Sequence, residues 1–198
     1  MKKSILIYGF AFLFVLSGFA QSSFAQANIL ELPAAQKTGG KPLMDALSLR
    51  KGERAMTNKA LTLQQLSNLL WSAWGINRSD GRRTIPTGMN KQEAAVYVVL
   101  ETGVWLYDAQ KNHLIQKLNQ DVRSKYSPAG VTLLYAVPAK DSFGKMHAGS
   151  MYQNAALYCA SEGLANVVKA SGSDALKGIL SLPSGYEIVI IQAIGYKK

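Results

Sequence analysis

Two short runs of β-forming residues, joined by only three residues, constrain the fold of this chain most strongly. Val96–Leu100 and Val104–Tyr107 are separated by Glu101-Thr102-Gly103. Because β-branched and aromatic residues favour strands and a short link with glycine joins antiparallel neighbours, this pattern predicts a hairpin. Apolar and polar residues alternate in Leu114–Leu118, which indicates a third strand. We therefore expect an antiparallel meander in the middle of the chain.

Helices and two more strands are expected around this meander. The predicted helices, where apolar residues recur at helical spacing, cover residues 41–49, 62–75, 149–162 and 173–180. Thr62 and Gln65 have the spacing of a capping box, so the second helix has the best-defined start. Apolar runs predict strands at Val131–Val137 and Tyr186–Ile194. The chain is thus expected to form one α+β unit.

Composition narrows the class of protein. A chain of 198 residues, 48% of them hydrophobic and 17% charged, has the material for one ordinary domain. The single cysteine, Cys159, excludes an intrachain disulfide and a cysteine-rich zinc site, and we expect it in the core of a helix. His113 and His147 lack metal-ligand spacing and are expected at the surface or in turns. No metal site is predicted.

The charge balance indicates an anionic partner. Lys and Arg number 22 against 12 Asp and Glu, which gives a net charge of +10. Nucleic acid, a membrane surface and a phosphorylated small molecule would all suit such a chain. Composition by itself does not choose among them.

The first 25 residues have the layout of a secretory signal peptide. Lys2 and Lys3 precede an apolar run from Ile5 to Phe19, and Ser23-Phe24-Ala25 supplies small residues for cleavage after Ala25. The run of about 15 residues is short for a spanning helix, which needs roughly 20. We therefore predict export to the periplasm with no stable membrane span after cleavage. An uncleaved membrane anchor is the alternative.

Removal of residues 1–25 leaves two further parts of the chain. Residues 26–40 form a polar entry segment, and residues 41–198 form the folded domain. The mature chain keeps an excess of +8, from 20 basic and 12 acidic residues. The domain itself is therefore basic.

The familiar catalytic motifs are missing from the sequence. It has no G-x-S-x-G elbow, no Walker loop and no G-x-G-x-x-G. Where protein side chains do not supply the chemistry, a cofactor usually does.

Several segments, in this order, resemble nitroreductase-family flavoproteins, and in particular their SagB-type dehydrogenase branch, whose best known members oxidise azoline rings. The segments are Arg50–Arg54, Leu70–Arg78, Arg82–Asn90, Val96–Asp108, Gly149–Leu164, Val167–Ser171 and Gln192–Tyr196. The resemblance covers nearly all of residues 41–198. It implies a homodimeric α+β fold, with a central, mostly antiparallel sheet flanked by helices and FMN at the subunit interface.

The resemblance also implies a reaction. FMN would carry two electrons, as a hydride, through flavin N5 in a ping-pong cycle, with reduction by one substrate and reoxidation by another. The sequence leaves the electron donor, the acceptor and the physiological substrate open.

By resemblance, the FMN phosphate would be bound by Arg50 and Arg54, with Lys51 close by. Guanidinium groups suit phosphate because they donate paired hydrogen bonds. The family usually has serine where this chain has Gly52, so one hydroxyl donor is missing. The alternative is an ordinary solvated run of charges.

Two further segments would contact the flavin ring. The loop Pro86-Thr87-Gly88-Met89-Asn90 would lie along it, with Asn90 hydrogen-bonded to its polar edge. A surface turn is the alternative for this loop. Lys169-Ala170-Ser171 would present backbone N–H groups to flavin N5. All of these assignments rest on the positions of the segments in the family pattern.

Several residues near these segments have more than one candidate role. Tyr126 and Tyr152 are candidate proton donors, with packing as the alternative, and no catalytic residue is assigned. Gln153 and Asn154 are expected to have a structural or loop-anchoring role at the start of their helix, with contact to the flavin as the alternative. Lys197 and Lys198 either add charge near the phosphate or form a frayed terminus.

Two functions of other kinds compete with the flavin enzyme. One is an exported flavin-binding or degenerate protein of the same fold that has lost turnover. The other is a basic domain that binds anionic polymers. No nucleic acid is expected as a partner, because an exported protein seldom meets it and aromatic residues are not interleaved with the basic ones.

Overall fold

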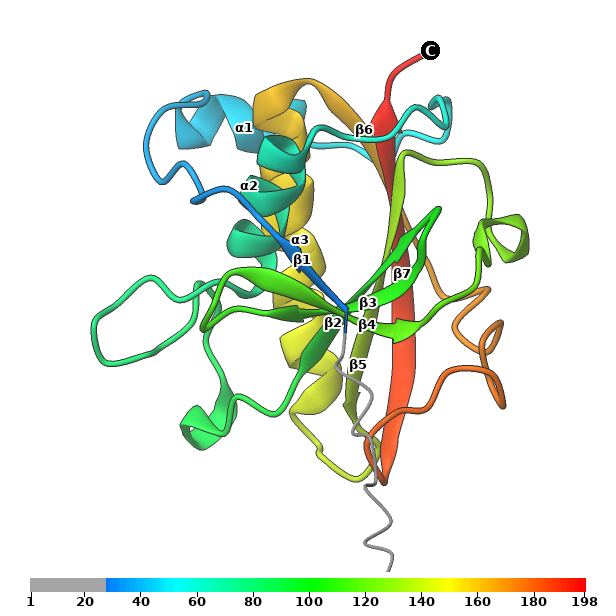
Figure 1. The fold of residues 1–198 in the computed structure, drawn as a ribbon. Helices are drawn as coiled ribbons and strands as arrows, with labels where there is room; N and C mark the ends of the chain where they lie inside the picture. Colours follow the sequence, from blue (N-terminus) through cyan, green and yellow to red (C-terminus); the bar gives the residue numbers. More distant parts are fainter. Residues whose placement is uncertain (1–27) are drawn as a thin grey trace, which may run out of the picture.

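A computed structural model describes residues 28–198. These residues form one sheet of seven strands in the order β1-β4-β3-β2-β5-β7-β6, and each neighbouring pair in it is antiparallel (Figure 1). The strands are β1 (Ile29–Glu31), β2 (Ala95–Leu100), β3 (Gly103–Asp108), β4 (His113–Leu118), β5 (Val131–Pro138), β6 (Leu164–Lys169) and β7 (Tyr186–Tyr196). The helices are α1 (Leu43–Leu49), α2 (Leu63–Trp74) and α3 (Gly144–Glu162). The predicted α+β class is confirmed.

The meander expected from the sequence is present as β2, β3 and β4. The turn between β2 and β3 depends on Gly103, whose φ is 122°. A Cβ atom at this position would lie 1.9 Å from the carbonyl oxygen of Leu118, so no larger residue fits without moving the backbone. Gly103, which indicated a hairpin in the sequence, is therefore also needed to let the backbone of β4 lie close to this turn.

Helices α2 and α3 cover one face of the sheet. The capping box of Thr62 and Gln65 is confirmed at the start of α2. Leu69 and Leu70 of α2, Met151 of α3 and Cys159 of α3 are fully buried against this face. The prediction that the cysteine is a core residue is therefore confirmed, and burial raises the pKa of its thiol.

Loops cover the other face of the sheet. Leu176 and Leu180 pack against Tyr97, Leu134 and Ile191 there. The helix predicted over residues 173–180 is wrong: the chain forms successive turns whose hydrogen bonds are of the i to i+3 type, except for one i to i+4 bond from the Leu180 N–H to the Leu176 carbonyl. Glycines with positive φ, at positions 172 and 178, flank and interrupt this segment. The apolar residues of this segment have helical spacing because they pack on the sheet, and they do not form a helix.

The structure differs from the sequence-based prediction in three other respects. Helix α3 begins at Gly144, five residues before the predicted start at 149. Strands β1 and β6 were not predicted. His113 and His147 were expected at the surface or in turns, but they are buried. His113 lies in β4 with its two ring nitrogens 3.6 Å from Glu31 and 3.4 Å from Asp108.

Within residues 28–198, no helix has both the length and the apolar character that a membrane span needs. The predicted signal peptide, residues 1–25, lies outside the described part of the chain and stays a prediction.

Truncation of Leu69 should reveal how strongly the fold depends on the α2 face. Leu69→Ala removes a fully buried side chain and should lower the free energy of unfolding by about 2–5 kcal/mol. Leu63→Ala is the matched control, because Leu63 is on the same helix and 47% exposed; its effect should stay within about 0.5 kcal/mol. Urea denaturation measures both, and equal losses would contradict this description of the core.

Candidate functional site

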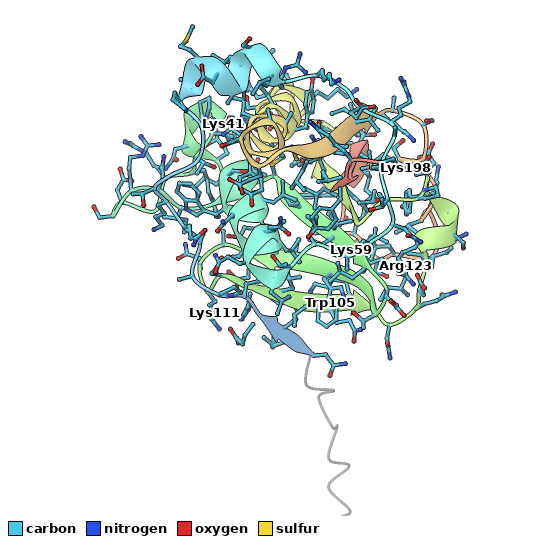
Figure 2. All side chains as sticks on the ribbon, turned by 90° about the horizontal axis from the view of Figure 1, so that it is seen from above. Lys41, Lys59, Trp105, Lys111, Arg123 and Lys198 are labelled. Carbon is cyan, nitrogen blue, oxygen red and sulfur yellow. The ribbon has the colours of Figure 1, made fainter. Side chains whose placement is uncertain are left out.

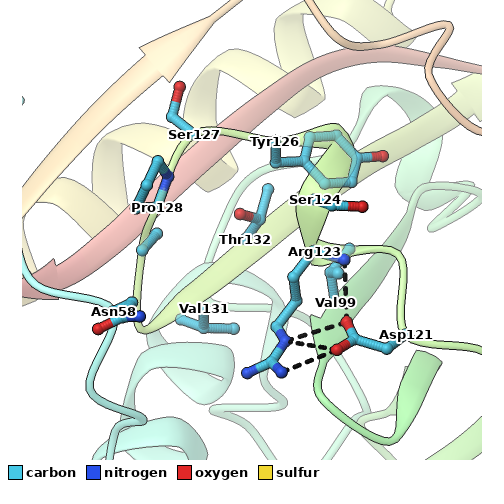
Figure 3. Close-up of a pocket in the computed structure, with 11 residues that line it drawn as sticks. Asn58, Val99, Asp121, Arg123, Ser124, Tyr126, Ser127, Pro128, Val131 and Thr132 are labelled. Carbon is cyan, nitrogen blue, oxygen red and sulfur yellow. Dashed lines mark hydrogen bonds and ion pairs between the residues drawn. The ribbon is translucent and has the colours of Figure 1, made fainter.

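A hollow of about 420 Å³ lies on the sheet face that α2 and α3 leave free (Figure 3). Val99 of β2 and Thr132 of β5, which are paired in the sheet, form part of its floor. One wall is the loop that leads into β5, and this loop includes the 3₁₀ turn Arg123–Lys125. Asn58 borders the hollow from a separate segment.

The segment that carries the predicted phosphate residues is held at the corner of β6 and β7. The Glu53 N–H donates to the Asn166 carbonyl of β6 at 2.7 Å. The Thr57 N–H donates to the Tyr196 carbonyl of β7 at 2.8 Å. These two bonds fix the segment on both sides of Arg54, and four residues later it reaches the hollow at Asn58.

The C-terminal residues lie against the same segment. Lys197 forms an antiparallel bridge with Met56, and the Lys198 N–H donates to the Ala55 carbonyl at 3.2 Å. The end of the chain is therefore paired with backbone beside Arg54. Figure 2 shows Lys59, Arg123 and Lys198 on the same side of the molecule.

Charge at this corner is only partly neutralised. Lys51 forms an ion pair with Glu53 at 3.2 Å, and this partner lowers the pKa of the Glu53 carboxyl. Within residues 28–198, neither Arg50 nor Arg54 lies within 4.0 Å of a carboxylate. Both residues are exposed. Two guanidinium groups are therefore free to bind an anion.

The third predicted segment borders the hollow from the end of β6. The Lys169 ammonium donates to the Ser127 hydroxyl at 2.6 Å, across to the wall of the hollow. Gly172, with φ of 95°, lies beside the Tyr126 ring, and a Cβ atom there would lie 3.1 Å from Ile191 and 3.6 Å from that ring. Within the described chain, the N–H groups of Ala170 and Ser171 donate to no protein acceptor.

The predicted loop 86–90 lies elsewhere. Its Gly88 N–H donates to His147 on α3, which packs on the opposite face of the sheet. Pro86, Thr87 and Asn90 line a separate depression with Arg78 and Arg82. One protomer therefore brings together the first and third predicted segments but leaves this loop apart.

The two candidate tyrosines have different surroundings. Tyr126 lines the hollow, its hydroxyl is buried with no hydrogen-bond partner, and burial raises its pKa to about 12. Tyr152 lies on α3 and packs against the core on the other face. Asn154 donates to the carbonyls of Ser72 and Thr84, so the expectation that it anchors loops is confirmed.

Sequence reasoning missed several residues of the hollow, among them Asn58, Arg123 and Ser127. Arg123 pairs with Asp121 at 2.8 Å and with Glu101 at 3.3 Å. Hydrogen bonds from Arg123 lower the pKa of the Asp121 carboxyl. Nothing in the local sequence distinguishes these residues from an ordinary polar loop. For Arg123 and Ser127 the only available signal was their position just before the strand β5, and Asn58 had none.

Comparisons with known proteins agree with the fold. Residues 48–196 match the sequence pattern of the nitroreductase family. A solved structure described as a nitroreductase from Ralstonia eutropha has a TM-score of 0.81 and 34% identity, and the match covers 86% of this chain and 90% of that one. A nitroreductase with bound FMN from Bacteroides fragilis has a TM-score of 0.55 and 15% identity, over 80% of this chain and 89% of that one.

Two more similarities extend these findings. A chain of the E. coli microcin synthetase McbBCD complex has a TM-score of 0.63 and 19% identity, over 93% of this chain and 84% of that one, which shows a shared fold. A protein of Methanocaldococcus jannaschii named as a nitroreductase is 25% identical over 99 residues, or 47% of this chain and 50% of that protein. The chain thus spans about half the length of that relative.

Stability should fall at alkaline pH partly because of Tyr126. The folded protein keeps this phenolic proton up to a pKa of about 12, whereas an unfolded tyrosine releases it near pH 10. The contribution is therefore complete below about pH 10 and is lost as pH rises to about 12. Tyr126→Phe should show a shallower fall of the urea midpoint over this range, with a constant offset from wild type below pH 9. Parallel curves throughout would contradict this assignment.

Proposed function

Because the chain belongs to the nitroreductase family, we propose that it is an FMN-dependent oxidoreductase whose flavin binds in the hollow beside Arg54. Bound FMN would supply two-electron chemistry at N5, accepting a hydride from one substrate and passing it to another. The protein groups hold the cofactor, exclude water from it and place positive charge near it.

The observation that carries this proposal is the pair of uncommitted guanidinium groups on the segment that reaches the hollow at Asn58. Arg50 and Arg54 have no carboxylate partner within the described chain, and backbone pairing places Lys197 opposite Met56, two residues after Arg54. A phosphate group would neutralise this corner and accept paired hydrogen bonds. Gly52 provides no hydroxyl, so the arginines would bear most of the phosphate binding.

The remaining groups around the hollow suit the rest of the cofactor. The Ala170 and Ser171 N–H groups are free to donate to a ring nitrogen or carbonyl. The Tyr126 hydroxyl is an orphaned buried donor in the wall of the same hollow. Free donors at one end and cations at the other match a molecule with a polar ring edge and a phosphate.

A homodimer would supply the missing loop. Loop 86–90 of one protomer lies on the wrong face of the sheet to reach that protomer's hollow, so we infer that it contacts the flavin of a second copy. Helix α1 supports self-association, because its Leu43, Met44, Leu47 and Leu49 side chains are between 43% and 73% exposed. Burial of such a face against another chain is favourable.

Two finer assignments belong to the same proposal. The SagB-type dehydrogenase branch is supported by the order of the motifs from Arg50 to Tyr196. Periplasmic export is supported by the signal-like sequence of residues 1–25, and it would require an electron donor other than cytosolic NAD(P)H and FMN acquired after translocation.

Purification of the mature protein tests the proposed function. A yellow protein that bleaches with a reductant and recovers its colour with an acceptor supports an oxidoreductase. A colourless protein that does not take up added FMN would overturn the flavin proposal. FMN binding without reoxidation by any acceptor would instead favour the flavin-binding protein that has lost turnover.

Arg54→Gln should weaken FMN binding by roughly 10- to 100-fold, because a hydrogen bond to a charged group is worth about 1.5–3 kcal/mol. Quenching of FMN fluorescence during titration measures the dissociation constant. Lys111→Gln is the control for net charge, since Lys111 is exposed in the turn between β3 and β4 and borders neither the hollow nor loop 86–90. Equal losses in both variants would show that only net charge matters.

Mixed dimers test whether the loop acts across the interface. Arg54→Gln and Asn90→Ala proteins should each bind FMN weakly. After unfolding and refolding together, heterodimers should contain one intact site and one doubly altered site, so high-affinity binding returns to up to one site per heterodimer. Two sites of unchanged weak affinity would mean that each protomer uses its own loop.

A further inference from the structure

A buried imidazole at the start of α3 holds the loop 86–90. His147 is 5% exposed, and its Nε2 accepts a hydrogen bond from the Gly88 N–H at 2.8 Å. A backbone N–H can only donate, so Nε2 carries no proton in this arrangement. The ring must therefore be neutral, with its proton on Nδ1.

A second contact confines Gly88 from another direction. The Phe143 ring stacks on the His147 ring with a centroid distance of 6.4 Å and an angle of 19°. A Cβ atom on Gly88 would lie 3.0 Å from the Phe143 ring. Gly88 is thus held by a hydrogen bond to one ring and by close packing against the other.

The rest of the loop depends on this attachment. Met89, Asn90 and Gln92 have φ values of 52°, 54° and 52°, in the left-handed region that costs energy for residues other than glycine. Such a conformation persists only when its surroundings fix it. Within residues 28–198, the bond to His147 is the only hydrogen bond that joins residues 86–90 to a helix or strand of the sheet core.

We propose that His147 is a positioning residue of the flavin site, whose neutral imidazole fixes loop 86–90 and so sets where Asn90 meets the flavin of the partner protomer. This inference rests on the proposed function for the meaning of the loop, but the attachment itself does not depend on FMN. His147 acts through the Gly88 backbone and does not itself touch the cofactor.

The first test uses the protein without cofactor. In ¹⁵N-histidine-labelled protein, the His147 ring should show the tautomer with a protonated Nδ1 and a hydrogen-bonded Nε2. Exchange of the Gly88 amide proton should be about ten-fold faster or more in His147→Leu, because the acceptor is lost. A protonated Nε2, or an unchanged Gly88 exchange rate, would overturn the attachment.

The second test measures FMN binding by the full protein. His147→Leu should raise the FMN dissociation constant by about ten-fold and shift the visible spectrum of the bound flavin, since a loosened loop changes the environment of the ring. His147→Gln should restore most of both properties, because its amide oxygen can accept from Gly88. His113→Leu removes the other buried histidine, away from the loop, and should leave the FMN constant unchanged even if stability falls.

Gly88→Ala is a second variant that tests the same contact in case the His147→Leu protein does not fold. It disturbs the same contact from the loop side, against the Phe143 ring, and should weaken FMN binding while α3 keeps its sequence. If wild type binds FMN but neither His147→Leu nor Gly88→Ala changes the constant or the spectrum, the positioning role is wrong and the proposed function stands. If wild type binds no FMN, the proposed function fails, and the tautomer and exchange measurements still decide the attachment.

Discussion

The antiparallel pairing of β5 with β7 supports the hollow and the segments that border it. The two strands pair from Val131 opposite Ile194 to Pro138 opposite Tyr186, with one register shift between Tyr135 and Ala136. The loop that walls the hollow enters β5, and β7 carries the basic C-terminal residues to the sheet corner. Strand β6, which ends at the Lys169 turn, is paired along β7. A shift of this register would separate the walls of the hollow from the cations at its rim.

Backbone hydrogen bonds at this corner have an electrostatic consequence. They bring Arg54 close to Lys197, although like charges repel. The nearby carboxylates are committed elsewhere, with Glu53 paired to Lys51 and Asp121 to Arg123. Positive charge is therefore concentrated on the segment that leads to the hollow, and an anionic ligand would offset the repulsion. This arrangement gives a physical reason for part of the basic excess seen in the composition.

Local sequence was a good guide wherever one strong signal decided the outcome. The capping box of Thr62 and the apolar face of α2 fix that helix, and Gly103 fixes the turn of the first hairpin. The spacing of Leu176 and Leu180 misled, because residues that pack on a sheet face from a series of turns can have the same spacing as a helix. Strand β1 has only three residues and gave no periodic pattern to detect.

The sequence alone determined the fold class, the helices α1 and α2, most of α3, the central strands and the burial of Cys159, since these depend on residues close together in the chain. It also singled out three segments by their resemblance to a family. Only the tertiary structure decided that the segments around Arg54 and Lys169 border one hollow while loop 86–90 lies on the opposite face. It alone buried His147 against Gly88, 59 residues away. Contacts between residues so far apart in the sequence depend on the order of the strands in the sheet, and local sequence patterns do not determine that order.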